Sequence, residues 1–518
     1  MKKVDSTWSL VNFIAIIFLL TIGVYIVVRA YLLSMTHDEA LTILSQGSQS
    51  YLNILLYNKG IRANNHLINS LLVRFVIGIV GYKAFFIRLG GLLGGCLYIY
   101  GAYKLSQKLF SGTWLFILSL VLLILNPYVL DFFSLARGYS LALGFLIVSL
   151  LYFFNSYDDS GPEEALRYKI KSFVLMSFAV ISNLSFLNVY VALIGAYFII
   201  EFMVTYSTTK NNLSFKVLND NFKKDLLHIF IITLGLFALI LLPLLKMAIK
   251  KQFYGGSTGF WHDTVTSLIQ SSLYGKEYFN SYNVFNIFII IIGFLIFINF
   301  AIKFYKKDPL NSSDKQLIII SSIIVLTALS IIFQNILFGT PFVTSRTAIY
   351  FIPLFTLYIF IFWKSILNNA FFRLRFIPNI LLSFCGIISL FHYISCINLS
   401  HTYDWRYDAS TKTAMHHIFE MENEIKPGKD QITIGATWWL VPAIDYYLLQ
   451  HGGQYKLIEP RGLYTLGPDG LYDYYYVYEC DKKILSKYHV TLLDHYALSN
   501  TYLGVSRFLK QNSAKNKT

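Results

Sequence analysis

The sequence predicts a polytopic α-helical membrane protein with a small α/β domain at its C-terminal end. Of its 518 residues, 55% are hydrophobic and only 14% are charged, whereas soluble domains carry roughly 25% charged residues. Apolar runs of nearly twenty residues recur between residues 11 and 396, and each is about long enough to cross a ~30 Å hydrocarbon core as a helix. Beyond residue 397, shorter amphipathic and alternating segments replace this pattern.

We expect about eleven transmembrane helices. They cover residues 9–33, 85–103, 113–134, 138–154, 171–183, 187–205, 228–247, 284–302, 316–336, 346–363 and 376–397. A twelfth apolar segment, 66–80, is short, contains Arg74 and follows polar residues, which favours a helix lying along the membrane interface. The expected domains are therefore a transmembrane domain, 1–397, with outer loops at 34–84 and 249–283, and a C-terminal domain, 398–518.

The distribution of charge indicates how the chain is oriented. The C-terminal domain has 13 basic and 13 acidic residues, so the whole net charge of +15 belongs to the first 397 residues. With the N-terminus inside, 18 of the 30 basic residues of the membrane part lie in six cytosolic stretches, as the positive-inside rule requires. An odd number of spans then places the C-terminal domain outside. Because topology accounts for the basic charge, no nucleic-acid partner is expected.

The C-terminal domain has the alternation of a small soluble α/β fold. Residues 408–425 and 442–450 have helical periodicity, and residues 431–435 and the tyrosine-rich 472–479 are typical of strands. Trp438 and Trp439 are candidates for stacking on sugar rings, although core packing is the more common role of such a pair.

Polar groups on the outer side of the membrane domain are the candidates for chemistry. Only five acidic residues fall there, and two of them, Asp38 and Glu39, are adjacent directly after the first span. Such a pair can supply a general base and a second carboxylate that orients a substrate or binds a cation. The same residues would also suit a solvated loop start or the N-cap of a helix that begins at Ala40, where acidic residues interact favourably with the helix dipole. The pattern alone favours this second, structural interpretation.

A series of motifs in a fixed order extends this observation. The motifs are Thr36-His37-Asp38-Glu39-Ala40, Asn65-His66-Leu67, Phe86-Ile87-Arg88-Leu89-Gly90-Gly91, Asn126-Pro127, Ala136-Arg137-Gly138-Tyr139-Ser140, and the segment from Ser345-Arg346-Thr347 to Pro353-Leu354. Over roughly residues 8–365 the chain resembles membrane glycosyltransferases of the C-type fold, in particular the family 39-like relatives of protein O-mannosyltransferases and aminoarabinose transferases. The Asp-Glu pair and the Arg-Gly-Tyr motif are the most specific elements.

This resemblance implies an activity and a location. Such enzymes take a sugar from a polyprenyl-phosphate carrier at the outer membrane face and transfer it to an acceptor hydroxyl on a surface glycan, lipid or protein. An undecaprenyl carrier and the bacterial inner membrane are the expected setting. By resemblance, Asp38 would be the catalytic base, Glu39 its neighbour in the acceptor site, and Arg137 and Arg346 the groups that face the donor phosphate.

The chemistry of the residues agrees with this set, and one motif departs from it. Arginine offers a planar fork for phosphate oxygens, although arginines at span ends more often extend to the interface. Many relatives have a Lys-Pro-Pro or His-Pro-Pro-like element where this chain has Asn64-Asn65-His66, so His66 or Arg62 would take the place of a phosphate-binding lysine. Tyr139 and the loop pair His262-Asp263 are further substrate-binding candidates, while an aromatic belt explains that loop equally well.

Neither a metal site nor a transport function is expected. His37, Asp38, Glu39 and His66 could bind a divalent cation, but no close His-x-x-x-His or Cys-x-x-Cys pair is present. A flippase for lipid-linked glycans should have paired halves and ionisable residues near the midplane, and the sequence has neither. A polysaccharide polymerase or ligase shares the outer-face chemistry and is the other alternative.

Overall fold

The computed structural model describes residues 6–58, 64–158, 161–208, 220–278, 281–306, 309–368, 376–425, 432–452, 455–458 and 470–506. Most of these residues are helical, and the chain divides into two compact units. The first unit comprises residues 1–27, 55–69 and 90–397, and the second comprises 28–54, 70–89 and 398–518. The second unit thus takes in two segments near the N-terminus that the sequence-based division assigned to the membrane domain.

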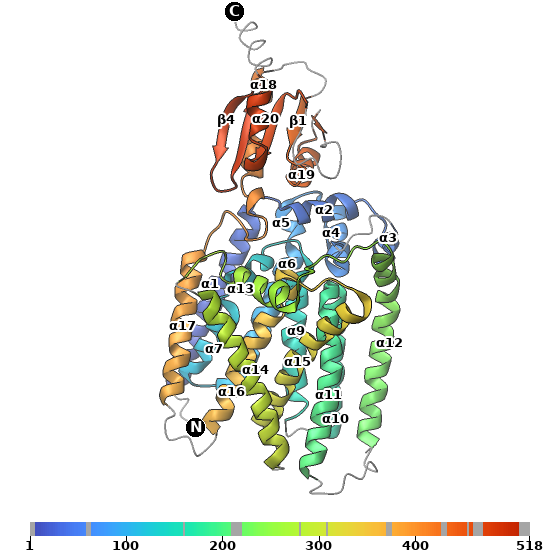
Figure 1. Cartoon of the computed structure of the whole chain (residues 1–518), viewed down its shortest axis with the longest axis vertical. Coiled ribbons are helices and arrows are strands. Elements are labelled where there is room, and N and C mark those ends of the chain that lie inside the picture. Colours follow the sequence, from blue (N-terminus) through green and yellow to red (C-terminus); the bar gives the residue numbers. More distant parts are fainter. Residues whose placement is uncertain are drawn as a thin grey trace, which may run out of the picture. The chain divides into compact units, whose positions relative to one another are not determined.

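Long helices build the first unit (Figure 1). They are α1 (Ser6–Leu32), α6 (Leu89–Phe110), α7 (Trp114–Ile124), α9 (Gly138–Asn155), α10 (Pro162–Ser182), α11 (Leu187–Thr208), α12 (Asp220–Ile249), α14 (Ser281–Lys306), α15 (Ser312–Phe338), α16 (Phe351–Asn368) and α17 (Phe376–Cys396). Helix α10 packs on α9 and α12, α11 packs on α15, α15 packs on α16, and α17 packs on α7. The packing therefore joins helices that are distant in the sequence.

Seven of the described helices are long and apolar enough to cross a membrane, and an eighth span is formed if one bent pair is counted. The chain is therefore a multi-pass membrane protein. Helices also cover the expected spans 85–103 and 171–183, but α6 and α10 do not meet the same criterion of length and apolarity. Helix α10 begins with several charged residues, including Glu163, Glu164 and Arg167. The full count of eleven spans stays a prediction.

The expectation of one continuous helix over residues 113–134 is wrong. Helix α7 ends at Ile124, and α8 (Pro127–Phe133) starts after a break with a bend of 69°. Asn126 accepts a hydrogen bond from the backbone N–H of Val129 at 3.1 Å and so caps α8. Pro127 has no N–H to continue α7 and suits the first position of a new helix. The sequence Asn-Pro is therefore a helix boundary here.

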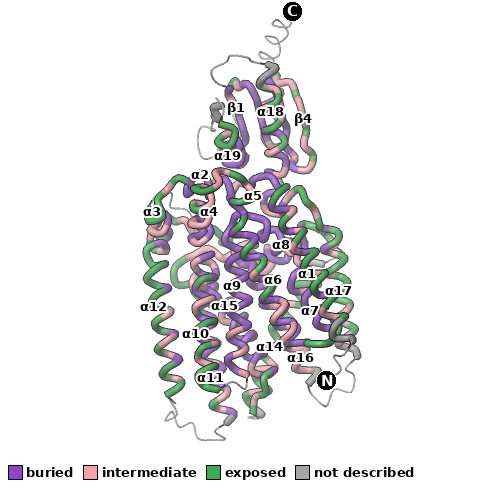
Figure 2. The backbone as a smooth tube through the Cα atoms, turned by 180° about the vertical axis from the view of Figure 1, so that it is seen from behind, coloured by how far each residue is buried: buried purple, intermediate pink, exposed green. Residues whose placement is uncertain are grey.

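Burial differs sharply among the helices (Figure 2). In α9, 83% of the apolar stretch is buried within the protein, whereas the buried share is 22% for α12 and 11% for the apolar stretch of α14. The exposed side chains of these outer helices are apolar, for example Phe230 and Phe297. In a membrane such side chains face lipid, because water would not tolerate so much apolar surface. Helix α9, which begins directly after Arg137, lies at the core of the unit.

The C-terminal part of the second unit contains a five-stranded sheet in the order β2-β1-β3-β5-β4. The strands are β1 (Ile432–Ala436), β2 (Tyr455–Ile458), β3 (Tyr474–Tyr478), β4 (Thr491–Tyr496) and β5 (Thr501–Val505). Strand β1 is parallel to β2 and β3, while β5 is antiparallel to β3 and β4. Tyr475, Val477, Leu485 and Tyr502 form a buried cluster on this sheet. The predicted α/β fold of this region is confirmed.

Helices complete the second unit. The C-terminal ones are α18 (Thr411–Ile425), α19 (Val441–His451) and α20 (Lys483–Lys487), of which the first two match the predicted helical segments. From the N-terminal segments come α2 (His37–Gln46), α3 (Tyr51–Leu55), most of α4 (Leu67–Val80), and α5 (Ala84–Ile87). Helix α19 packs against α2. The Asp-Glu pair of α2 therefore lies within the unit that contains the C-terminal sheet.

Candidate functional site

The second unit positions the Asp-Glu pair on the first turn of α2. Thr36 precedes this helix with extended backbone geometry, and both its backbone N–H and its hydroxyl donate to Glu39 Oε2 at 3.1 Å. The segment Thr-x-x-Glu is thus a capping arrangement, in which the Glu side chain reaches back to the residue before the helix. The helix-start interpretation of the pair is therefore correct for Glu39.

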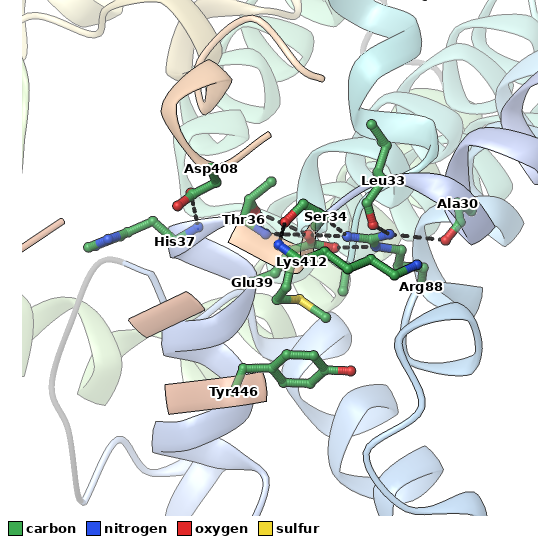
Figure 3. Close-up of polar contacts among 12 residues, drawn as sticks. Ala30, Leu33, Ser34, Thr36, His37, Glu39, Arg88, Asp408, Lys412 and Tyr446 are labelled. Atoms are coloured by element: carbon green, nitrogen blue, oxygen red, sulfur yellow. Dashed lines mark hydrogen bonds and ion pairs between the residues drawn. The ribbon is translucent and has the colours of Figure 1, made fainter. Parts of the chain in front are cut away.

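Glu39 also forms a buried ion pair with Arg88, which follows α5 (Figure 3). Arg88 Nε donates to Glu39 Oε1 at 2.9 Å, and Nη2 donates to Oε2 at 2.8 Å. Neither side chain is exposed to solvent. This is the bidentate geometry in which a guanidinium and a carboxylate interact most strongly.

The remaining donors of Arg88 bind the end of α1. Nη1 donates to the carbonyls of Ala30 and Leu33 at 3.0 and 2.9 Å, and Nη2 donates to that of Ser34 at 2.8 Å. The last carbonyls of a helix have no partner within the helix and carry partial negative charge. All five N–H groups of Arg88 are thereby used. Arg88 fixes both the end of α1 and the start of α2, and it has no donor left for Asp38.

Asp38 is buried on the same turn, with 9% of its surface exposed. Its backbone carbonyl accepts a hydrogen bond from Thr42 at 3.0 Å, as a regular helix allows. Its charge and that of Glu39 act on Asp408, a buried carboxyl of the same unit whose pKa is raised first by burial and then by these two neighbours. The two adjacent carboxylates therefore have different surroundings, because Glu39 alone is paired with Arg88.

The first unit contains a second cluster, formed by His66, Arg137 and Tyr139. Arg137 precedes α9 and is 2% exposed. The rings of His66 and Tyr139 lie 4.9 Å apart, and the Arg137 guanidinium carbon lies 5.9 Å from the Tyr139 ring. Arg137 also donates to the carbonyl of Asn64 at 3.4 Å. The Arg-Gly-Tyr motif thus meets the polar stretch before α4.

Gly138 makes this meeting possible. A Cβ atom at this position would lie 2.0 Å from the carbonyl oxygen of Ser182 and 2.7 Å from Cβ of His66. Real Cβ atoms do not approach other atoms so closely, so only glycine allows α9 to start against these two segments. The motif is therefore explained by close packing as well as by the chemistry of its arginine.

His66 connects the cluster to Arg346. Burial lowers the pKa of His66, and the positive charges of Arg137 and Arg346 lower it further, while a hydrogen bond to the backbone of Ser182 acts in the opposite direction. His66 Nε2 is buried and makes no hydrogen bond to any described residue. The structure therefore brings three of the predicted donor-phosphate residues together. A site with two guanidinium groups and an imidazole suits an anion.

The loop that follows α12 supports the segment that carries Arg346. Gly256 forms a β-bridge with Phe342, and the backbone N–H of Ser345 donates to the hydroxyl of Ser267 at 2.9 Å. Ser345 has a positive φ of 40°, which is strained for a residue other than glycine. These contacts hold the turn η3 (Ser345–Ala348), and with it Arg346, in an unusual backbone conformation.

Asp263 organises this loop through its carboxylate. It accepts hydrogen bonds from the N–H groups of Thr258 and Gly259 at 2.8 and 2.9 Å, and from the Thr258 hydroxyl at 2.5 Å. His262 Nδ1 lies 3.1 Å from the same carboxylate. Burial works to raise the pKa of Asp263, but these hydrogen bonds outweigh it and lower the pKa. In the structure Asp263 serves the loop itself, and the predicted substrate contacts of Asp263 and His262 stay predictions.

The other predicted residues are placed as follows. Arg62 lies outside the described residues. Asp38 and Glu39 belong to the second unit, while His66, Arg137, Tyr139 and Arg346 belong to the first, so a cavity shared by Asp38 and the two arginines stays a prediction. Among the described residues, no group of three His, Cys, Asp or Glu side chains could hold a metal ion.

Sequence reasoning did not assign a role to Arg88. It noted the residue only as part of the Phe86–Gly91 motif, and nothing in that motif specifies a partner 49 positions away. The sequence does contain one signal: Arg88 stands directly before a glycine-rich apolar run. A charged side chain that is buried at such a place needs a partner of opposite charge. Asp408 gave no signal of this kind.

Comparison with known proteins gives similarity of structure without a match in sequence. No family model and no curated protein matches this chain. The structure is similar to that of ArnT from Cupriavidus metallidurans, solved in the apo state and bound to undecaprenyl phosphate, with 10% identity, 94% of this chain and 97% of that chain covered, and a TM-score of 0.45. It is also similar to the Archaeoglobus fulgidus oligosaccharyltransferase complex with Zn and sulfate, with 13% identity, coverage of 95% and 73%, and a TM-score of 0.43.

Proposed function

We propose that this protein is a membrane glycosyltransferase that moves a sugar from a polyprenyl-phosphate donor to an acceptor hydroxyl. The observation that carries the proposal is that the adjacent carboxylates of Asp38 and Glu39 have different surroundings. Arg88 neutralises Glu39 with two of its donors and gives the other three to backbone carbonyls, and Asp38 is the carboxylate of the pair to which we assign the proton acceptor role. Pairs of carboxyl groups with divergent surroundings are typical of acid–base sites.

The anion cluster supplies the other half of the reaction. As the glycosidic bond breaks, negative charge develops on the leaving lipid phosphate, and fixed positive groups stabilise it. Arg137, Arg346 and His66 lie close enough for both arginines to act on the imidazole. In this mechanism they bind the donor phosphate, Tyr139 shapes the same pocket, and Asp38 removes the proton of the acceptor hydroxyl as the new bond forms.

The setting we propose follows from topology and from the family resemblance of the motifs. The protein lies in the bacterial inner membrane, its C-terminal domain is extracytoplasmic, and the donor is an undecaprenyl-phosphate hexose or pentose. Glu39 has a positioning role in this scheme, because the ion pair with Arg88 holds its carboxylate away from the acceptor. No catalytic step in the scheme requires a metal ion.

The test is a profile of lipid-linked sugars and envelope glycans in cells that lack the gene. We expect a carrier-linked sugar to accumulate and a sugar residue to be missing from an envelope glycan, lipid or protein. Wild-type protein and Asp494→Asn, an exposed carboxylate of the C-terminal domain, should restore both profiles. Asp38→Asn should restore neither, although it inserts into the membrane normally. Restoration by Asp38→Asn would refute Asp38 as the base, and an unchanged lipid-linked pool with blocked translocation would indicate a flippase.

A further inference from the structure

The C-terminal segment binds the backbone that leads into the Asp-Glu turn. The hydroxyl of Tyr447 accepts the backbone N–H of Met35 at 2.8 Å and lies 3.3 Å from the hydroxyl of Ser34. The backbone N–H of Lys412 donates to that serine at 3.2 Å. All these residues belong to the second unit. Residues 34 and 35, which lie just before α2, are thus held by residues more than 370 positions later.

Asp408 makes the contact nearest to the proposed base. Its Oδ2 accepts the backbone N–H of His37 at 2.6 Å (Figure 3). His37 is the first residue of α2 and the residue directly before Asp38. The first N–H groups of a helix have no partner within the helix, and the residue before the helix usually reaches the second or third of them. Asp408 therefore accepts a hydrogen bond from a helix-terminal N–H that has no acceptor in the neighbouring sequence.

Asp408 is itself fixed in place. It is 1% exposed, ends the turn η4 (Arg406–Asp408), and donates its backbone N–H to the carbonyl of Trp405 at 3.0 Å. It also lines a small pocket together with Leu33, Thr36 and Thr402. His37 is held from a second side, since its ring Nδ1 lies 2.7 Å from the carbonyl of Trp439. The main chain at His37 has little freedom to move.

The surroundings of Asp408 favour its neutral form. Burial raises its pKa, and the nearby charges of Asp38 and Glu39 raise it further, against the effect of the His37 hydrogen bond. A neutral carboxylic acid beside Asp38 avoids repulsion between two carboxylates. Oδ2 accepts from His37, and Oδ1 has no hydrogen-bond partner among the described residues. Asparagine has nearly the same shape as aspartic acid and carries no charge.

We infer that Asp408 is a positioning residue for Asp38: it holds the first backbone N–H of α2 and so fixes the turn that presents the catalytic carboxylate. This inference rests on the proposed function. According to this inference, the C-terminal domain helps to position the catalytic carboxylate. This role is additional to any contact that the domain makes with the acceptor. A misplacement of about 1 Å in a catalytic group can cost about 100-fold in rate, so loss of this contact should act mainly on turnover.

The test compares three variants of the full-length protein in lipid nanodiscs. Asp408→Ala removes the hydrogen bond, and Asp408→Asn keeps an oxygen that accepts from His37. Asp473→Ala is the matched control, because Asp473 is also buried in this domain and accepts a backbone N–H and a hydroxyl hydrogen bond from Thr433. Three quantities are measured: hydrogen–deuterium exchange of a peptide covering residues 35–41, binding of undecaprenyl phosphate, and the rate of sugar transfer from a lipid extract of the gene-deleted cells.

The inference predicts a specific pattern. Asp408→Ala should exchange faster over residues 35–41 and lose about 10- to 100-fold in transfer rate at saturating donor, with undecaprenyl-phosphate binding unchanged. Asp408→Asn should restore both the slow exchange and most of the rate. Asp473→Ala should lower the thermal stability of the domain while keeping slow exchange in this peptide and wild-type turnover.

Other outcomes separate this inference from the proposed function. Wild-type turnover in Asp408→Ala, or an equal loss in Asp408→Asn and Asp473→Ala, would overturn the positioning role while Asp38→Asn stays inactive. Activity of Asp38→Asn would instead overturn the assignment of the base. In that case the exchange measurement alone still decides whether Asp408 holds the turn.

Discussion

Arg88 and Glu39 form a bidentate ion pair in which neither side chain is exposed to solvent. The pair joins the segment after α5 to the first turn of α2, and the same guanidinium binds three carbonyls at the end of α1. Removing one partner of a buried pair leaves an uncompensated charge in a medium that solvates it poorly. The pair therefore fixes three chain segments around Asp38. Its loss should lower the stability of the protein more than it changes the chemical step.

We expect Arg88→Met to destabilise the protein by about 3–5 kcal/mol, because it leaves Glu39 charged and unpaired and exposes three carbonyls to an apolar surrounding. Thermal unfolding in detergent, followed by circular dichroism, measures the change. The double variant Arg88→Met/Glu39→Leu should recover part of this loss, since neither partner of the pair is then left as a buried charge. Arg74→Met is the control, because Arg74 makes one backbone hydrogen bond, to Gln49. A loss in Arg88→Met no larger than that in the control would contradict the structural role.

Gly138→Ala should destabilise α9 by about 1–3 kcal/mol, as overpacking does, because the new Cβ would clash with Ser182 and His66. The same shift should weaken binding of undecaprenyl phosphate, since Arg137 and His66 sit at this contact. Gly235→Ala in α12 is the matched control, because a Cβ there meets nothing within 4 Å. That control should be neutral or slightly stabilising. Equal effects of the two substitutions on stability and binding would show that the close approach at Gly138 is not needed.

Binding of the donor phosphate should depend on pH through His66. Burial and the charges of two arginines lower the pKa of His66, and a bound phosphate would raise it again. Binding then takes up a proton, so affinity should increase as the pH falls through the higher, bound-state pKa and level off below the lower, empty-state pKa. A polyprenyl phosphodiester is the suitable ligand, because its single charge is constant over this range.

His66→Gln should remove this pH dependence and weaken binding at low pH, whereas His417→Gln in α18 should retain the dependence. The measurement is a binding titration between pH 5 and pH 8 for the wild type and both variants. An identical slope in the wild type and in His66→Gln would assign the effect to another group.

The orientation of the chain can be tested directly. Reporter fusions after Asn398 should give an extracytoplasmic signal, and fusions within residues 208–225 a cytosolic one, because most basic residues of the membrane part lie on the expected inner side. A cytosolic signal after Asn398 would invalidate both the odd number of spans and the side on which the transfer site is placed.

Local patterns in the sequence predicted local structure well. The 3.6-residue periodicity located α18 and α19, and the alternation of apolar residues located β1 and β3. Strands β4 and β5 were missed, since β4 is only partly buried and β5 is buried throughout and contains Gly504. Neither strand therefore has the regular alternation that identifies one. Asn126-Pro127 was noted as a motif, yet the apolar residues on both sides concealed the helix break.

The candidate site was predictable only where its residues are close in sequence. Asp38 and Glu39 are adjacent, and the Arg-Gly-Tyr motif is contiguous, so their types and spacing could be recognised. The partner of Glu39 is 49 positions away and the partner of His37 is 371 positions away. Such pairings depend on how helices and strands pack, and no local spacing encodes them. The residue pattern alone therefore gave no partner for either carboxylate, and the structure pairs Glu39 with Arg88.

The separation of 371 residues between His37 and Asp408 has a consequence for the order of events during biosynthesis. At 5–20 residues per second, translation of the intervening chain takes roughly 20–75 s. During that time the first helix has been inserted, and Arg88 has been made and is available to Glu39. The N–H of His37, however, has this acceptor only after Asp408 has been synthesised. A nascent chain, or one truncated before Asp408, would thus be integrated in the membrane yet lack the contact that positions Asp38, so that full activity requires synthesis to pass residue 408.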